Sequence, residues 1–156
     1  MTIRLLQPQS AREWRLARTL IEEYAASLGL DLSFQDIAHE LEHLAAEYGP
    51  PAGAFLLAEE GGSQLGCVGL RHFSAGAGEI KRLYTVPGAR GRGLGRALAE
   101  AIVARGRELG YERLLLDTLP AMQDAQRLYL SLGFKPTAAY RYNPVAGTAF
   151  LELRLS

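Results

Sequence analysis

The stretch of sequence best suited to chemistry is a glycine- and arginine-rich segment at residues 86–96, Val-Pro-Gly-Ala-Arg-Gly-Arg-Gly-Leu-Gly-Arg. It joins a predicted strand directly to a predicted amphipathic helix. Glycines allow positive φ and close approach of a ligand, and the first amides of a helix lack partners and carry a positive dipole. Arg90, Arg92 and Arg96 add positive charge around the same turn. The segment therefore predicts a diphosphate site.

Two other phosphate-binding loops fit this segment less well. A P-loop ends in Gly-Lys-Ser/Thr, whereas residues 93–96 are Gly-Leu-Gly-Arg. A dinucleotide-binding loop needs its third glycine at position 96, which is arginine. Asp117 ends the next predicted strand, near where a ribose-binding acid would lie, so the dinucleotide interpretation stays open, as does a glycine-rich turn without a ligand.

Three segments together resemble the GNAT acyltransferases. The pattern Arg90-x-x-Gly93-x-Gly95 resembles the Q/R-x-x-G-x-G/A signature whose loop holds the coenzyme A pyrophosphate in that family. Residues 79–87 look like the family's fourth strand, and residues 125–134 are similar to its A-x-x-L-Y-x-x-x-G-F segment. The resemblance implies an N-acetyltransferase that uses acetyl-CoA and no metal.

The same resemblance assigns the coenzyme contacts. It places the pantetheine arm along the backbone of residues 83–85, with the amide near Leu83 facing the oxyanion. Many relatives carry Asn where this chain has Met122, so Asp117, Thr118, Gln123 or Asp124 could supply the missing polar contact. The implied coenzyme residues are Leu83, Tyr84, Thr85, Arg90, Gly91, Arg92, Gly93, Leu94, Gly95, Arg96, Met122, Ala125 and Tyr129.

Acetyl transfer to an amine needs a base and an acid. A lysine-like amine has a pKa near about 10.4 and must lose a proton before it attacks the thioester. By resemblance, Glu79 is the candidate base, directly or through water, and Tyr129 is the candidate acid for the leaving thiolate. A solvent-exposed turn residue and a core tyrosine are the structural alternatives for these two positions.

The acceptor is expected to be a primary amine of a small molecule or peptide. The resemblance places its entrance between the first two helices and the loop joining the last strands. Its candidate lining residues, which could equally be core or turn residues, are Tyr24, Phe34, Tyr140, Tyr142 and Asn143. A noncatalytic acyl-CoA-binding sensor would use the same glycine loop and remains the alternative from another functional class.

A zinc-hydrolase pattern, H-E-x-x-H, occurs at His39-Glu40-Leu41-Glu42-His43. At about 100° per residue, both histidines point away from the apolar face of their predicted helix, so we expect them in solvent. No third zinc ligand presents itself, and zinc chemistry stays a remote alternative.

The periodicity of apolar residues indicates which elements position these groups. Capping-box spacings at Ser10–Glu13 and Ser33–Asp36 open two helices, the second with Ile37, Leu41, Leu44, Ala45 and Tyr48 on one face. An α/β fold of GNAT type is predicted, with a central mixed, mostly antiparallel sheet and helices on both faces. The predicted strands are 2–6, 54–59, 65–73, 79–86, 113–118 and a final pair containing Tyr140, Tyr142 and residues 148–155; the helices are 10–28, 33–48, 94–109 and 122–132.

Length and composition set the remaining expectations. A chain of 156 residues with 48% hydrophobic and 22% charged residues predicts a single domain over residues 1–156. Since 17 basic residues offset 17 acidic ones, no field favours nucleic acid. No apolar run is long enough for a membrane span, and Cys67 is expected to be a buried thiol. A cytoplasmic monomer or homodimer is predicted.

Overall fold

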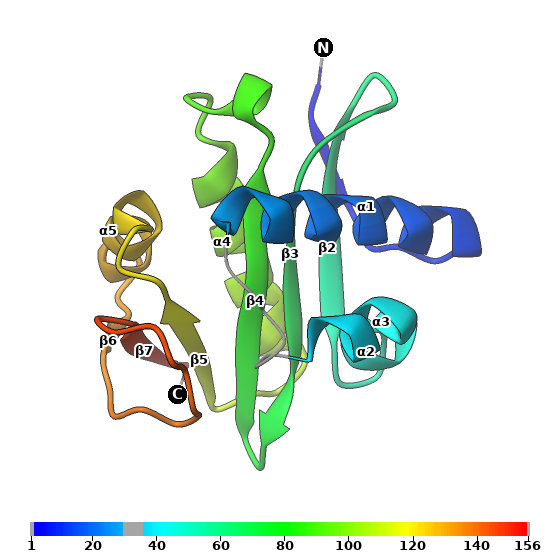
Figure 1. The fold of residues 1–156 in the computed structure, drawn as a ribbon. Coiled ribbons are helices and arrows are strands. Elements are labelled where there is room, and N and C mark those ends of the chain that lie inside the picture. Colours follow the sequence, from blue (N-terminus) through cyan, green and yellow to red (C-terminus); the bar gives the residue numbers. More distant parts are fainter. Residues whose placement is uncertain (1, 30–35, 156) are drawn as a thin grey trace.

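The computed structural model describes residues 2–29 and 36–155, which form a central sheet covered by helices on both faces (Figure 1). Within this described part the sheet has seven strands in the order β1-β2-β3-β4-β5-β7-β6. The elements are β1 (Arg4–Leu6), α1 (Ala11–Leu28), α2 (Ile37–Glu42), α3 (Leu44–Tyr48), β2 (Ala54–Glu60), β3 (Ser63–Ser74), β4 (Ala77–Thr85), the 3-10 helix η2 (Pro87–Ala89), α4 (Leu94–Glu108), β5 (Arg113–Thr118), α5 (Gln123–Ser131), β6 (Lys135–Pro136) and β7 (Ala149–Arg154).

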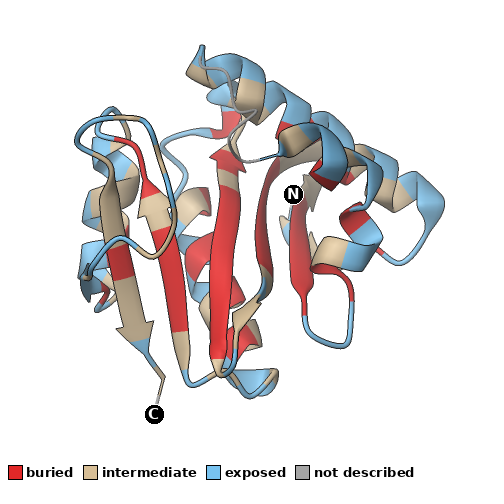
Figure 2. Cartoon of the chain, turned by 60° about the horizontal axis from the view of Figure 1, so that its bottom comes forward, coloured by how far each residue is buried: buried red, intermediate tan, exposed pale blue. Residues whose placement is uncertain are grey.

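Two layers of apolar contact hold the sheet between its helices. Helices α1 to α3 pack on one face, around Ile21, Tyr48 and Phe55. Helices α4 and α5 contribute to the cluster on the other face, around Leu98, Ile102 and Tyr129. The inner strands are therefore buried along most of their length (Figure 2). This arrangement confirms the predicted mixed, mostly antiparallel sheet.

Strands β4 and β5 form the parallel pair of the described sheet, and they separate part-way along. Their pairing covers only Ala77–Glu79 against Arg113–Leu115. Beyond those residues β4 runs on to Thr85 and β5 to Thr118 without pairing to each other. Backbone groups on the facing edges are thus left available for a ligand between the strands.

Helix α1 begins and ends as its sequence predicts. The Ser10 hydroxyl accepts a hydrogen bond from the Glu13 amide at 3.1 Å, and Gly29 ends the helix in the left-handed conformation. In a capping box the Glu13 side chain would accept from the Ser10 amide. Here the Glu13 carboxylate accepts instead from the amide of the preceding residue, Gln9, at 2.8 Å. No described helix combines the length and apolar character that would allow it to cross a membrane.

The second predicted helix is instead two short helices. The backbone leaves the helical region at His43, between α2 and α3, and Ala45 is exposed. Glu40 is buried because it is paired with an arginine of the sheet, so α2 docks through a polar contact that hydropathy cannot reveal. Ser33, the predicted cap, lies outside the described residues.

The predicted strand containing Tyr140 and Tyr142 is wrong. Only Lys135 and Pro136 pair with β7 before the chain leaves the sheet, and both tyrosines lie in the irregular segment 137–148. The segment is held by side chains rather than by a ladder, since Tyr140 donates a hydrogen bond to Glu79 across the sheet.

Candidate active site

The glycine loop forms an open anion-binding turn before α4. Gly91 and Gly93 have φ of 82° and 73°, the left-handed region that favours glycine. Gly93 is the N-cap of α4 and offers no side-chain cap, and the first intrahelical bond runs from the Ala97 amide to the Gly93 carbonyl. The preceding helical amides therefore face outward, where the helix dipole favours a phosphate group.

A groove of about 530 Å³ runs along this loop. It includes ten of the predicted coenzyme residues and adds Ala89, which also contacts the core on the α4 side. Its lining residues are Tyr24, Ser27, Leu28, Leu83, Tyr84, Thr85, Ala89, Arg90, Gly91, Gly93, Leu94, Gly95, Ala121, Met122, Gln123, Asp124, Ala125 and Leu128.

All three loop arginines donate to protein groups, and two of them point to other side chains. Arg92 binds the Glu60 carboxylate through both terminal nitrogens, at 3.2 and 2.9 Å. Arg96 donates to the Ser131 hydroxyl at 2.6 Å. Arg90 donates to the Thr85 carbonyl at 3.2 Å and is the loop arginine that lines the groove.

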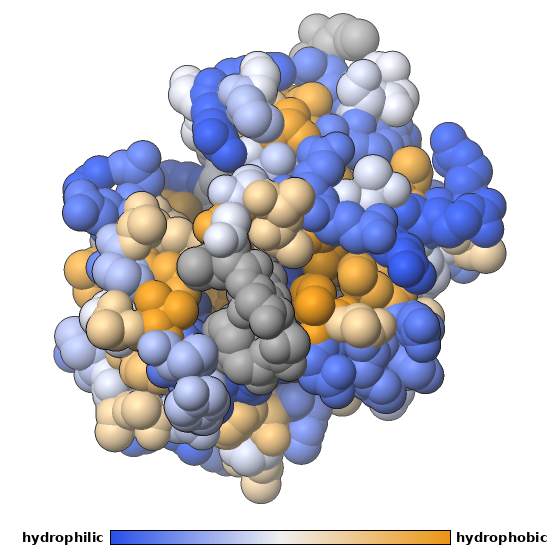
Figure 3. All heavy atoms as spheres, viewed as in Figure 1, coloured by the Kyte–Doolittle hydropathy of each residue, from blue (hydrophilic) through white to orange (hydrophobic). Residues whose placement is uncertain are grey.

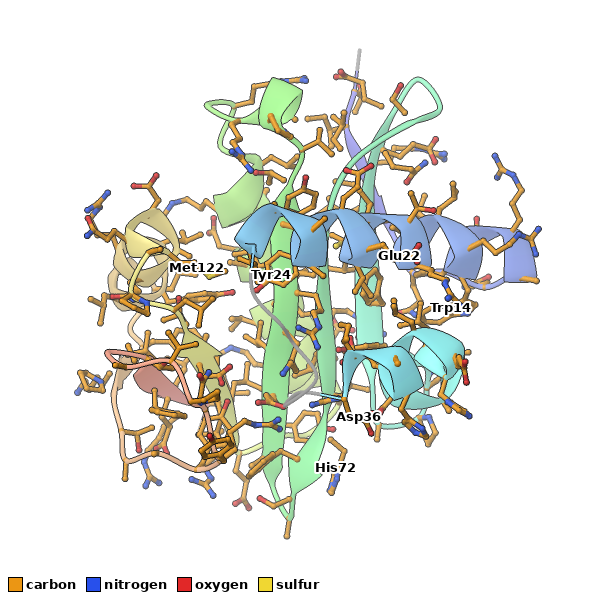
Figure 4. The ribbon with its side chains drawn as sticks, in the orientation of Figure 1. Trp14, Glu22, Tyr24, Asp36, His72 and Met122 are labelled. Atoms are coloured by element: carbon orange, nitrogen blue, oxygen red, sulfur yellow. The ribbon has the colours of Figure 1, made fainter. Side chains whose placement is uncertain are left out.

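The groove leads to a smaller inner cavity of about 50 Å³ between the separated strands. Tyr24 on α1 and Met122 before α5 line both spaces and mark their junction (Figure 4). The inner cavity is lined by Tyr24, Leu28, Ile80, Lys81, Arg82, Leu83, Leu116, Asp117, Thr118, Leu119, Met122, Ala125, Tyr129 and Asn143.

Tyr129 reaches the inner cavity from α5. It is 4% exposed and packs edge-on against Phe134, with ring centroids 5.3 Å apart. Burial raises the pKa of the Tyr129 phenol, so the hydroxyl keeps its proton at neutral pH. It is therefore a proton donor at the wall of the cavity.

Glu79 is the last residue of β4 that pairs with β5; it is fully buried and does not line the inner cavity. Its carboxylate accepts from Tyr140 at 2.7 Å, from Arg141 at 2.7 Å and from Arg71 at 3.3 Å. These three donors hold the carboxylate in place between β3, β4 and the 137–148 segment. The Glu79 charge also helps to raise the Tyr140 pKa, second to burial.

A buried pair between α2 and β4 extends this network. Arg82 donates to Glu40 at 2.8 and 2.9 Å, and Arg71 lies 3.5 Å from the same carboxylate. Burial opposes ionisation of Glu40, but the Arg82 hydrogen bonds and charge outweigh it and lower the Glu40 pKa. Arg82 has a φ of 65° at an irregularity in the β3–β4 register. The extra residue lets Lys81 and Arg82 both face the α1–α3 side.

Lys81 and Asp117 line the inner cavity on that same side of the sheet. Burial lowers the pKa of Lys81 to about 8, although nearby Glu79 opposes the shift. The Asp117 carboxylate accepts from the Asn143 side chain at 3.2 Å. The cavity therefore offers groups of both signs to an acceptor.

The predicted acceptor residues are only partly brought together. Tyr24 and Asn143 line the inner cavity. Tyr140 holds Glu79 instead, and Tyr142 is 75% exposed and outside the lining. Phe34 lies outside the described residues.

Apolar residues lie in separate areas of the surface that is seen in the orientation of Figure 1 (Figure 3).

Sequence reasoning missed several residues of this end of the site. Lys81 and Arg82 carried a usable signal, because two adjacent cations inside a predicted strand need partners or a ligand. Glu40, Arg71 and Arg141 carried none, since their distances from Glu79 and Arg82 arise only in the folded chain.

The H-E-x-x-H segment does not form a paired-histidine site around its glutamate. His39 and His43 are exposed, as predicted, and their rings stack at 4.1 Å. Glu40 points to Arg82, and the helix between the histidines ends at Glu42. The arrangement therefore gives zinc hydrolysis no support.

Comparison with known proteins identifies the family. The sequence profile of the Acetyltransferase (GNAT) family matches residues 14–134. An uncharacterized N-acetyltransferase of Schizosaccharomyces pombe is 40% identical over 151 residues, covering 96% of this chain and 91% of the relative. A GNAT acetyltransferase of Staphylococcus aureus Mu50 has a TM-score of 0.80 at 18% identity, covering 99% of this chain and 100% of that structure. The yncA structure of Salmonella typhimurium, solved with its cofactor acetyl-CoA, has a TM-score of 0.70 at 19% identity, covering 100% and 95%.

The fold and the family match thus define an acyltransferase enzyme. The chain belongs to the GNAT acetyltransferase family, because the family profile spans most of its length. Membership implies an amine as the acceptor.

Proposed function

We propose that the chain transfers the acetyl group of acetyl-CoA directly to a primary amine of a small molecule or peptide. One observation carries the proposal: the glycine-loop groove meets, at Tyr24 and Met122, an inner cavity that contains the Tyr129 proton donor. A diphosphate bound at the loop would leave the rest of the coenzyme directed along the groove to that cavity.

The residues present fit the coenzyme. Outward helical amides at the loop suit its diphosphate, and the β4 edge at residues 83–85 suits the amide-rich pantetheine arm. The proposed coenzyme-binding set is Leu83, Tyr84, Thr85, Arg90, Gly91, Gly93, Leu94, Gly95, Met122, Ala125 and Tyr129. Arg92 and Arg96 lie outside both linings and are proposed to contribute through the backbone of the loop and of the first turn of α4.

The chemistry requires two proton transfers. The amine nitrogen attacks the carbonyl carbon, an amide C–N bond forms, and the C–S bond breaks to release coenzyme A. The amine nitrogen loses a proton to the base, and the departing sulfur gains one from the acid. We assign the acid to Tyr129, which burial keeps protonated.

Glu79 is proposed as the proton acceptor acting through water. Direct contact has little support, because Glu79 is outside the cavity lining and holds three donors. Glu79 lies two residues before Lys81 on the same face of β4, and Lys81 lines the cavity. In this position the buried negative charge of Glu79 would attract a proton that water carries from the amine.

Turnover measurements with acetyl-CoA and a panel of amines test this function. Tyr129→Phe should lower kcat by roughly 100-fold or more while coenzyme affinity stays near that of the wild type, because only the proton donor is lost. Glu79→Gln should lower kcat at neutral pH, with recovery as the pH approaches the amine pKa and the amine loses its proton unaided.

Three results would count against the proposal. Calorimetry that detects no coenzyme A binding would remove the site itself. Binding without thiol release for any amine would favour the acyl-CoA sensor. Full activity in Tyr129→Phe would reject Tyr129 as the acid, and a Glu79→Gln loss that persists at high pH would reject Glu79 as the base.

The cellular setting is also a proposal. The buried, unpaired Cys67 suits a reducing cytoplasm, and burial raises its pKa, which keeps the thiol unreactive. Equal numbers of basic and acidic residues support a partner other than nucleic acid. We propose a single domain over residues 1–156, acting as a monomer or homodimer away from the membrane.

A further inference from the structure

Thr118, the last residue of β5, has an unusual hydroxyl. The residue is 4% exposed and lines the inner cavity. Its Oγ1 is buried and, among the described residues, has no hydrogen-bond partner. A buried hydroxyl without a partner is unfavourable and uncommon in folded proteins. A ligand in the cavity would supply the missing partner.

The alternation of side chains along β5 indicates which part of a ligand Thr118 meets. Leu114 and Leu116 belong to the same apolar cluster as Tyr129, so Thr118, two residues further on, continues their face. Asp117 takes the opposite face, toward the acceptor side. Thr118 also lines the inner cavity and not the outer groove, which places it beyond the pantetheine arm.

Thr118 is also the best placed, for a contact with the acyl end, of the four polar residues that the sequence leaves open around Met122. Asp117 already accepts from Asn143, and Asp124 is exposed and paired with Arg127. Gln123 is exposed beside the outer groove. Of the four alternatives left open by the sequence, Thr118 is the one whose side-chain oxygen is both buried and without a partner.

We propose that the Thr118 hydroxyl binds the acyl end of acetyl-CoA, donating a hydrogen bond to the thioester carbonyl oxygen. This inference rests on the proposed function. A thioester carbonyl only accepts hydrogen bonds, so it complements a hydroxyl that has found no acceptor in the protein. The contact distinguishes acetyl-CoA from free coenzyme A, which lacks that oxygen.

Calorimetry of Thr118→Val with acetyl-CoA and with coenzyme A tests the contact. Valine keeps the shape of the side chain and removes the hydroxyl. We expect acetyl-CoA affinity to fall roughly 3- to 10-fold, as for loss of one hydrogen bond, with coenzyme A affinity unchanged. The melting temperature without ligand should stay the same or rise, because a buried unpaired oxygen is removed.

Two further variants serve as controls. Thr118→Ser retains a hydroxyl and should keep the wild-type preference for acetyl-CoA. Thr19→Val removes an exposed hydroxyl that donates to Arg15 in α1, outside both cavities, and should alter neither affinity.

Several outcomes overturn the inference. Equal losses for acetyl-CoA and coenzyme A would place the hydroxyl at the pantetheine arm, and unchanged affinities would show that Thr118 touches no ligand. Both results leave the proposed function standing, provided that the wild type binds and turns over acetyl-CoA. Failure of the wild type to bind either molecule would overturn the proposed function and this contact together.

Discussion

Two regions of the candidate site are formed by different kinds of group. One is the groove at the glycine loop, and the other, called here the acceptor end, is the inner cavity with the buried charges beside it. The groove depends on backbone: left-handed glycines, a helix start and a strand edge, all within residues 83–95. The acceptor end depends on buried charges from α2, β3, β4 and the 137–148 segment, joined through Glu40 and Glu79. Contiguous backbone is robust to changes of side chain, whereas a network of buried charges requires every member.

This difference bears on how each end can vary. A backbone site suits what is constant in a ligand, which for the proposed coenzyme is its diphosphate and its amide arm. Side chains that line the acceptor end determine what differs between substrates. Because Arg82 lines the inner cavity and is held by Glu40, a substitution in this charge network should disturb stability as well as specificity.

The largest expected effect is at the acceptor end. Glu40→Gln should lower the free energy of unfolding by about 3–5 kcal/mol, because it leaves the buried Arg82 guanidinium without its charged partner. Chemical denaturation measures the loss. Replacing both residues by methionine should restore much of it, and a loss below about 1 kcal/mol in Glu40→Gln would show that the pair is not structural.

The next effect is at the groove. Gly93→Val should reduce coenzyme A affinity by roughly 100-fold, since a side chain at φ 73° strains the loop and displaces its amides. Gly110→Val is the matched control, because Gly110 has φ 87°, has no atoms near its added Cβ, and lies outside the groove. Both variants should lose similar stability. Equal losses of affinity would argue against the loop as the coenzyme site.

The smallest expected effect is a pH dependence at Lys81. Its pKa is about 8 in the folded chain and 10.5 ordinarily, so between these values the unfolded chain binds more protons and stability rises with pH. The wild type should therefore gain about 2 kcal/mol relative to Lys81→Met between pH 8 and 9.5. Denaturation at stepped pH measures the difference. A flat difference would mean that burial does not perturb Lys81.

Much of the fold could be predicted from sequence because its signals are local. The Ser10 cap, the Gly29 stop and β5 lie where the pattern places them. The break at His43 and the irregular segment 137–148 could not be predicted, because each depends on a partner distant in sequence. Glu40 is held by Arg82, and Tyr140 is held by Glu79.

The candidate site divides in the same way. Most loop residues assigned by the motif line the groove, since a short glycine-rich turn before a helix has few conformations. The motif could not show that Arg92 would turn to Glu60 or Arg96 to Ser131. It also could not show that Glu79 would be enclosed by three donors, away from the cavity.

By itself, the sequence determined the family and most of the elements, and it predicted a diphosphate site at the glycine loop, because capping, periodicity and glycine conformation act between near neighbours. Tertiary structure alone decided where β4 and β5 separate, which buried charges meet, and that the Thr118 oxygen remains without a partner. These features depend on contacts between residues far apart in the chain, and their electrostatic strength depends on burial that exists only once the sheet is covered.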